Sequence, residues 1–209
     1  MKIPSFVRTS CGVLLCWLAV LVPSHASSVR DVTVAEMLAG SELVVQGRVV
    51  GQRVEGTGGK GGIFTVLTLE IVDVVKGTPA SRTIELRYLG GQLGDQTLRV
   101  SEMALPALGE QGLYFVEKPG RRAVHPLYGW QQGHLVVERD PASGVELVKT
   151  QQREAIYAIE ARPERRAQAA AVPGAAAGLR LQSATPGELP LDVENFKQQL
   201  RRMLGGGRQ

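Results

Sequence analysis

Apolar and polar residues alternate through the middle of the chain, and this pattern predicts a series of short β-strands. Ile84, Leu86 and Tyr88 alternate with charged residues, which places the three apolar side chains on one face of a strand. The longest candidate strand is 63–75, whose alternation breaks near its end as in a bulged or coiled strand. Further apolar stretches separated by turn residues lie at 43–50, 97–100, 112–116, 123–125, 133–138 and 145–149. Because no long helices intervene, we expect an all-β domain over 42–150 that forms either a small closed antiparallel barrel, which we prefer, or a sandwich.

A helical pattern precedes the strands, within the segment 27–41. Thr33 followed by Glu36 is a capping box, and Gly40 ends the helix. The apolar face consists of Val34, Met37 and Leu38.

A second helical pattern lies at the C-terminal end, in 191–209, where Asp192 is an N-cap candidate. The residues that recur on its apolar face are Val193, Phe196, Leu200 and Met203. An isolated helix of this length is marginal in water, so we expect order only when this face is covered. Either the helix docks on its own domain, or it binds a partner.

The segment 151–190 joins the strands to the C-terminal helix. Its first part predicts a short helix from Arg153 to Ala161, with Ile156 and Ile159 facing inward. The remainder, up to Pro190, is rich in Ala, Gly and Pro and predicts a flexible linker.

The first 26 residues resemble a secretory signal peptide. Lys2 and Arg8 precede an apolar run over 13–22, and Ser24-His25-Ala26 is a small-x-small cleavage site. The run is about ten residues, whereas a membrane-spanning helix needs about 20. We therefore expect cleavage after Ala26, a periplasmic or secreted protein, and no membrane span in the mature chain.

Cysteine usage and charge narrow the possible chemistry. Cys11 and Cys16 both lie in the signal, so the mature chain has no disulfide, no thiol nucleophile and no cysteine metal ligand. The 24 basic and 20 acidic residues become 22 and 20 once Lys2 and Arg8 are removed, a net charge of +2. This near-neutral balance gives no support to nucleic-acid binding.

Several stretches of the strand region, taken together, resemble a pattern found in uncharacterised exported bacterial proteins. They are 43–50, 65–77, 84–86 with Gly90-Gly91, and 109–115. The same stretches are similar, more distantly, to netrin-like and metalloproteinase-inhibitor modules, whose fold is an OB-type barrel. The resemblance implies an OB-like fold. It transfers no functional residue, because the inhibitors act through an N-terminal cysteine and this chain is expected to begin at Ser27.

Candidate catalytic and metal sites are weak in this sequence. His125 and His134 are nine residues apart, without the spacing that sets two ligands on one metal, so they are interpreted as ordinary polar positions. Ser101, His134 and Asp140 can be combined into a triad on paper, but no G-x-S-x-G turn supports it. The glycine-rich stretch 56–62 departs from the phosphate-binding pattern and predicts a mobile hairpin loop. No cofactor is expected.

The best surface candidate surrounds an aromatic pair. Its residues are Tyr128, Trp130, Gln131 and Gln132. Exposed aromatic rings beside amides suit a peptide or sugar platform, whereas the same rings buried would plug the end of a barrel.

The sequence therefore favours an exported, non-catalytic binding or accessory module, with another exported protein such as a protease as its partner. The alternative is a small periplasmic hydrolase or ligand-binding enzyme with its site at the barrel mouth. A concave site where an acid, a base and a nucleophile converge would favour that alternative.

Overall fold

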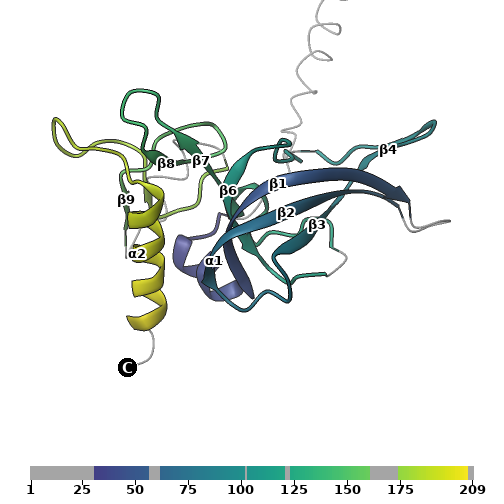
Figure 1. Ribbon diagram of the computed structural model, residues 1–209, viewed down its shortest axis with the longest axis horizontal. Helices are drawn as coiled ribbons and strands as arrows, with labels where there is room; N and C mark the ends of the chain where they lie inside the picture. The colour runs from purple at the N-terminus through teal and green to yellow at the C-terminus, as the bar shows by residue number, and fades with distance from the viewer. Residues whose placement is uncertain (1–30, 57–61, 102, 121–122, 161–173, 207–209) are drawn as a thin grey trace, which may run out of the picture.

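The computed structural model describes residues 31–56, 62–101, 103–120, 123–160 and 174–206 (Figure 1). The expected signal peptide at 1–26, most of the glycine-rich loop and the first part of the linker lie outside the described residues.

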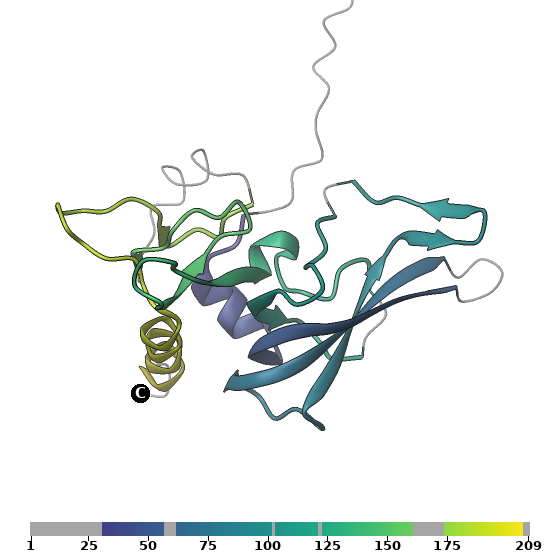
Figure 2. The same ribbon diagram turned by 45° about the horizontal axis from the view of Figure 1, so that its top comes forward.

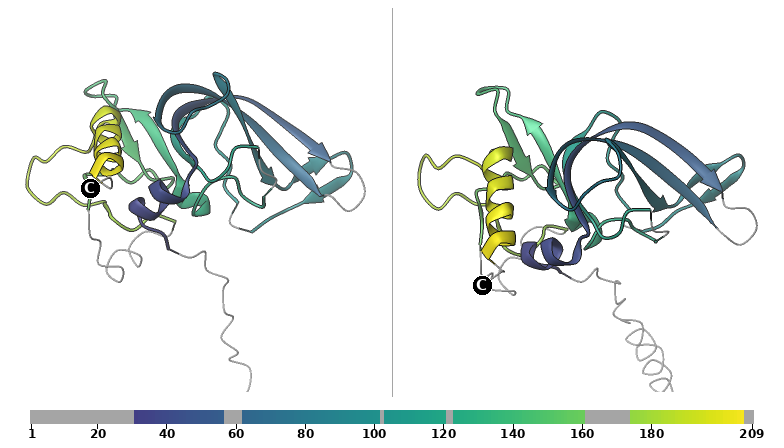
Figure 3. Two further views of the ribbon diagram at one scale, coloured as in Figure 1. Left: turned by 90° about the horizontal axis from the view of Figure 1, so that it is seen from below. Right: turned by 60° about the horizontal axis from the view of Figure 1, so that its bottom comes forward.

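The described chain is mostly β, and its main element is one antiparallel six-stranded sheet in the order β3-β2-β1-β6-β7-β8. The strands are β1 (Leu43–Gly56), β2 (Ile63–Lys76), β3 (Thr83–Leu89), β6 (Gln111–Val116), β7 (His134–Arg139) and β8 (Glu146–Lys149). Figures 1 and 3 show β1 and β2 as a long curved ribbon that extends away from the helices.

The sheet is open, so the expectation of a closed barrel is wrong. β3 and β8 are its two edges and do not pair with each other. Two features explain the open form. The register of β1 against β2 shifts at three points, and such bulges bend and twist a long strand pair, here with β3 at its outer side. On the other edge, β8 is covered by later chain, because Val148 N–H donates to the Leu191 carbonyl and the Val148 carbonyl accepts from Ile156 N–H.

Smaller elements complete the molecule. The strands β4 (Gly91–Leu93) and β5 (Gln96–Leu98) form a protruding hairpin, visible in Figure 2. The strands β9 (Ala158–Ile159) and β10 (Leu179–Arg180) pair with each other, and η2 (Trp130–Gly133) is a single 3₁₀ turn.

The helix expected from Arg153 to Ala161 does not form in its described part, 153–160. Arg153 has a φ of 66°, in the left-handed region, which a helix does not accommodate. The backbone of Ile156 instead pairs with two other segments. Its N–H donates to the Val148 carbonyl, and its carbonyl accepts from Leu191 N–H. Tertiary pairing of the backbone has therefore overridden the local apolar spacing.

The helix α1 (Val34–Gly40) forms as its capping signal predicts. The Thr33 side chain accepts from Glu36 N–H, and the Glu36 carboxylate accepts from Thr33 N–H, so the capping box is confirmed. At the other end, the Lys76 ammonium donates to the carbonyls of Leu38, Ala39 and Ser41, at 2.7, 3.1 and 2.6 Å. These bonds satisfy the C-terminal carbonyls of α1 and tie it to the end of β2.

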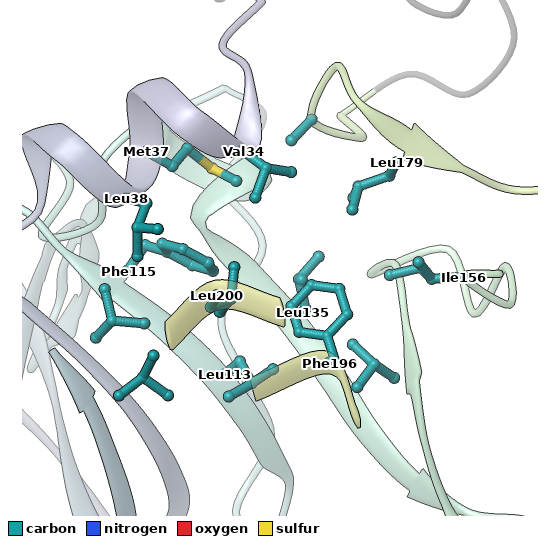
Figure 4. Close-up of a cluster of buried hydrophobic side chains, with 14 of the residues drawn as sticks. Val34, Met37, Leu38, Leu113, Phe115, Leu135, Ile156, Leu179, Phe196 and Leu200 are labelled. Carbon is teal, nitrogen blue, oxygen red and sulfur yellow. The ribbon is translucent and has the colours of Figure 1, made fainter. Parts of the chain in front are cut away.

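The sheet separates two hydrophobic cores, because successive residues of a strand point to opposite faces. In β6, Leu113 and Phe115 face the helices, whereas Tyr114 and Val116 face the other side. The helix-side core includes Val34, Met37, Leu113, Phe115, Leu135, Ile156, Phe196 and Leu200, as Figure 4 shows. The tyrosine-side core consists of Leu43, Val45, Val49, Leu67, Leu69, Leu86, Tyr88, Tyr114, Val116 and Leu127.

The C-terminal helix α2 (Val193–Gly206) packs on the helix-side core of its own chain. Phe196 and Leu200 are fully buried and point toward the sheet (Figure 4), Val193 is buried, and Met203 packs at the margin. Among the helices of the described ranges, none has the length and apolar character needed to cross a bilayer.

A buried lysine fixes α2 in place. The Lys197 ammonium bonds to Gln46 Oε1 at 2.7 Å, to Asp73 Oδ2 at 2.6 Å and to Glu194 Oε1 at 2.6 Å. Hydrogen bonds from Lys197 and Arg201 outweigh partial burial and lower the pKa of Asp73. The Lys197 ammonium and the Asp73 carboxylate, which hold α2 on the sheet, are therefore both paired.

Candidate functional site

A group of aromatic and imidazole rings lies at the edge of the tyrosine-side core. Tyr114 of β6 stacks on His134 of β7, with ring centroids 4.7 Å apart. Tyr88 of β3 meets His125 edge to face at 4.9 Å, and His125 stacks on Trp130 at 5.4 Å. These five residues, here called the ring cluster, come from three strands of the sheet and from the chain that connects β6 to β7.

Strand register and one glycine make room for the cluster. His134 lies directly opposite Tyr114 in the β6–β7 pair, so the two rings share a face of the sheet. A Cβ on Gly112 would come within 2.6 Å of His134 Nε2 and 2.8 Å of the Leu135 carbonyl. Only glycine at this position lets the imidazole lie against β6.

Four polar atoms of the ring cluster are buried without a hydrogen-bond partner. They are the hydroxyls of Tyr88 and Tyr114 and the Nε2 atoms of His125 and His134. A buried polar group without a partner costs on the order of 1–3 kcal/mol, so native proteins contain few of them. Four in one cluster mark it as the most unusual part of the described chain.

The groups that contact the ring nitrogens of the two histidines determine their tautomers. Leu127 N–H donates to His125 Nδ1 at 3.2 Å, so the hydrogen of the neutral ring is on Nε2. The Gln151 side-chain amide lies 3.0 Å from His134 Nδ1, and the Glu110 carboxylate lies 3.5 Å from His134 Nε2. The carboxylate favours a hydrogen on Nε2 here as well. Both free imidazole nitrogens are therefore N–H donors.

Burial keeps the ring cluster uncharged. It lowers the pKa of His125 to about 4, against a smaller opposing effect of the bond from Leu127 N–H. Burial, with the charge of Arg153 and the neighbouring His125, lowers the pKa of His134 to about 3. Burial and the Glu110 carboxylate raise the pKa of the Tyr114 phenol. At neutral pH the cluster presents two phenol O–H and two imidazole N–H groups.

A small cleft of about 160 Å³ opens beside His134. Arg153 donates to Glu110 Oε2 at 2.9 Å, and Glu110 in turn faces His134, so the charged groups form a chain along the cleft. The described residues that line it are Ala104, Leu105, Pro106, Glu110, His134, Val136, Gln151 and Arg153. Glu110 is largely covered, whereas the Arg153 side chain is 48% exposed.

Backbone strain coincides with this region. Trp130 and Arg153, with φ of 59° and 66°, are the non-glycine residues of the described chain that have positive φ. Such residues cost on the order of 1 kcal/mol or more and persist where the surroundings determine them, often at functional sites. Trp130 belongs to the ring cluster, and Arg153 lines the cleft.

A second cleft, of about 400 Å³, lies next to β3 and the β4–β5 hairpin. Tyr88 and Thr65 line it, together with the left-handed glycines Gly90 and Gly91. Leu105 lines this cleft as well as the cleft at His134. The connection between β5 and β6 therefore runs past both openings.

The connection also carries an exposed apolar segment, residues 104–108, here called the apolar loop. Ala104, Leu105, Ala107 and Leu108 are exposed, and only Pro106 is buried. Leu108 is 67% exposed and Leu105 is 38% exposed. Runs of exposed apolar residues are unusual on soluble proteins unless they serve a contact.

Of the four residues expected to form a surface, three are half-buried and one is buried. Tyr128 is half-buried at the margin of the helix-side core, and Trp130 stacks on His125. Gln132 is buried, and its Oε1 accepts from Val32 N–H at 3.0 Å. Gln131 is half-buried beside them. The bond from Val32 to Gln132 ties the start of the described chain to η2.

The triad that can be written from the sequence is not assembled. Asp140 bonds to Ser143 within an exposed turn, and Ser101 is exposed outside the residues that line the His134 cleft. His134 instead faces Glu110 and Gln151. Sequence reasoning missed Glu110, Gln151 and Arg153, whose only signal was their position in turns between strands. The apolar loop was visible as the sequence Ala-Leu-Pro-Ala-Leu between polar residues.

Metal binding finds little support in this geometry. In the part of the chain that the structure describes, no three His, Cys, Asp or Glu side chains gather where they could hold an ion. Coordination through His125 Nε2 would need both ring nitrogens free of hydrogen, because Leu127 N–H occupies Nδ1.

In comparisons with known proteins, no family model, no curated protein and no solved structure matches this chain.

Proposed function

We propose that this chain is an exported, non-catalytic binding module that contacts another exported protein through its apolar loop, 104–108. The observation that carries the proposal is the exposure of four of the five loop residues beside the His134 cleft. Apolar side chains in water lose the free energy that burial would supply, about 25 cal/mol per Å². A partner surface that covers Leu105 and Leu108 recovers it.

The residues that line the cleft support a partner of a particular chemistry. Ala104 and Leu105 form one wall, and the Arg153 guanidinium is half-exposed at the opening. A partner segment with an apolar side chain for the loop and a carboxylate for Arg153 matches both features. Since Glu110 already pairs with Arg153, the carboxylate of the partner shares that guanidinium.

The lining of the cleft supports binding over hydrolysis. Its described residues include an acid, Glu110, and an imidazole, His134, and among them there is no hydroxyl or thiol side chain. His134 is also held neutral and directed at Glu110, an arrangement that fixes the ring in place. A nucleophile does not converge with the acid and base.

Export is part of the proposal and is supported by the signal-like sequence at 1–26. The partner is placed in the same compartment for that reason. A protease was suggested by resemblance to barrel-shaped inhibitors. The open sheet weakens that analogy, so the proposal names an exported protein of the stated chemistry rather than a protease.

The test begins with capture from the exported fraction of the producing cells, using the processed chain as bait. The captured protein is identified by mass spectrometry, purified and titrated calorimetrically against wild type, Leu108→Asp and Leu189→Asp. Leu189 is 82% exposed and lies outside the loop, so it provides a matched control. We expect Leu108→Asp to weaken binding at least about tenfold, because a charge replaces a buried apolar contact. Leu189→Asp should bind as wild type.

Equal affinity for wild type and Leu108→Asp would overturn the proposal. Sedimentation analysis of the purified chain tests whether a second copy of the chain, rather than another protein, binds the apolar loop. Self-association that Leu108→Asp abolishes would also overturn it, since the loop would then serve a homodimer.

A further inference from the structure

The larger cleft, beside Tyr88, has a floor that belongs to the sheet. Thr65 of β2 and Tyr88 of β3 lie opposite each other in the strand register, so their side chains share a face. Both residues line the cleft, and both are almost completely buried, at 3% and 1% exposed. The floor is therefore a fixed part of the molecule.

Glycines hold the β4–β5 hairpin close to this floor. Gly90 and Gly91 have φ of 117° and 142°, in the region that favours glycine. A Cβ on Gly91 would come within 2.8 Å of Thr65 Oγ1, and a Cβ on Gly90 within 3.1 Å of the Leu98 carbonyl. Thr65 also donates to the Gly90 carbonyl at 2.8 Å. These contacts fix the wall that the hairpin gives to the cleft.

Apolar side chains dominate the interior of the cleft. In addition to the Tyr88 ring, they are Leu89, Leu98, Val100, Met103 and Leu105. The volume of about 400 Å³ lies within the range of small-molecule sites, roughly 300–1,000 Å³. The hydrocarbon part of a small ligand therefore fits this lining.

Arg99 adds a cation to the apolar lining. Among the described residues that line the cleft, no other side chain is charged. Arg99 is exposed, and no carboxylate within the described ranges pairs with it. In the cleft at His134, by contrast, Arg153 already pairs with Glu110. An exposed guanidinium without an ion-pair partner can bind a carboxylate through two parallel hydrogen bonds.

The nearby charges of the strands do not compensate Arg99. Side chains alternate between the two faces of β3, so Glu85 and Arg87 point away from the cleft floor. There they pair with Arg53 and Glu55 of β1, respectively, each at 2.9 Å. The described groups around the cleft therefore favour an anion over a cation.

We propose that this cleft binds a small apolar carboxylic acid, whose carboxylate pairs with Arg99 and whose hydrocarbon part occupies the lining. A protein chain that ends in an apolar residue offers the same two groups. The volume, however, is that of a site that encloses a whole small molecule, which favours the free acid. The site adjoins the apolar loop at Leu105, but binding of the acid needs no partner protein, so the two proposals are tested independently.

The experiment titrates the processed chain with cyclohexanecarboxylate at neutral pH and follows the backbone amides of 88–92 and 97–100 by NMR. Three further probes each lack one feature: cyclohexanecarboxamide has no charge, cyclohexylmethylammonium has the opposite charge, and acetate has no ring. We expect saturable shifts with cyclohexanecarboxylate, weaker binding of the amide, and no saturable shifts with the ammonium ion or acetate. The N-acetylated peptide Gly-Gly-Leu represents a chain end and should bind more weakly than the free acid.

Variants test whether Arg99 holds the carboxylate. Arg99→Gln should weaken binding of cyclohexanecarboxylate at least about tenfold, the effect of losing a charge-assisted hydrogen bond, and should leave the spectrum of the remaining chain unchanged. Arg202→Gln removes the same charge from an exposed position on α2 and should bind as wild type. Equal binding by Arg99→Gln and wild type, no saturation by cyclohexanecarboxylate, or equal binding of the ammonium ion would overturn the proposal. Tighter binding of the peptide than of the free acid would overturn the assignment to a small molecule.

Discussion

The two sides of the sheet treat their buried polar groups in opposite ways. On the helix side, the Lys197 ammonium has three partners, and Lys76 caps the end of α1. On the tyrosine side, two phenol hydroxyls and the Nε2 atoms of two imidazoles are equally buried but lack a hydrogen-bond partner. Satisfied polar groups hold a fold in one arrangement, whereas unsatisfied ones reduce stability unless something binds them. The helix side is accordingly the structural half, and the two clefts open on the tyrosine side, beside His134 and Tyr88.

The largest effect is expected from weakening the helix side. Phe196→Ala should lower the free energy of unfolding by about 3–5 kcal/mol, because Phe196 is fully buried and the change leaves a cavity. Urea unfolding of the processed chain measures the change. Leu189→Ala, at an exposed position, should stay within about 0.5 kcal/mol of wild type. If Phe196→Ala were as stable as wild type, α2 would not be part of the cooperative core.

The next effect concerns pH and belongs to the tyrosine side. His125 and His134 have folded pKa values of about 4 and 3, below the ordinary value of 6.5, so the unfolded chain takes up protons first as the pH falls. The contribution of the two neutral histidines to the free energy of unfolding is fully present above pH 6.5. It declines as the pH falls toward the folded pKa values of about 4 and 3. At pH 5 the loss relative to pH 8 should be about 2 kcal/mol per histidine.

Urea unfolding at a series of pH values measures this decline. His134→Gln should remove about half of it, since His125 is the other histidine expected in the processed chain. A stability that stays constant from pH 8 to pH 5 would show that the imidazoles are accessible to protons in the folded protein.

The smallest effect has an unusual sign. Tyr88→Phe removes a buried hydroxyl without a partner, so in the absence of ligand it should raise the free energy of unfolding by about 1 kcal/mol. Thermal unfolding measures the shift, with Tyr157→Phe as the reference for loss of a hydroxyl elsewhere. A lower stability for Tyr88→Phe would mean that the hydroxyl is bonded in solution, and the contrast between the two sides would shrink.

Local signals in the sequence predicted local structure well. The capping box at Thr33 and Glu36 lies within one helical turn, and α1 forms there. The apolar face with Phe196 and Leu200 is likewise contained in one helix, and α2 includes it. In both cases the residues that decide the structure are neighbours along the chain.

Features that depend on distant residues were beyond the sequence. Barrel closure was predicted from strand number, but it depends on how the bulges of β1 and β2 orient β3. Lys197 has the spacing of an ordinary polar helix residue, yet it is buried. Its burial depends on an ion pair with Asp73, which lies 124 positions earlier in the chain. The two histidines were interpreted as ordinary polar positions, since only the register of β6 with β7 brings His134 onto Tyr114.

The open sheet has a consequence for assembly in a crowded compartment. An open edge is a template onto which another extended chain can add, and repeated addition leads to aggregation. The β8 edge is closed off by the chain at Ile156 and Leu191. On β3, Glu85 and Arg87 form ion pairs across to Arg53 and Glu55, so an incoming strand meets a row of fixed charges. Replacing Glu85 and Arg87 together with valine would turn this edge into a self-complementary surface prone to fibril growth.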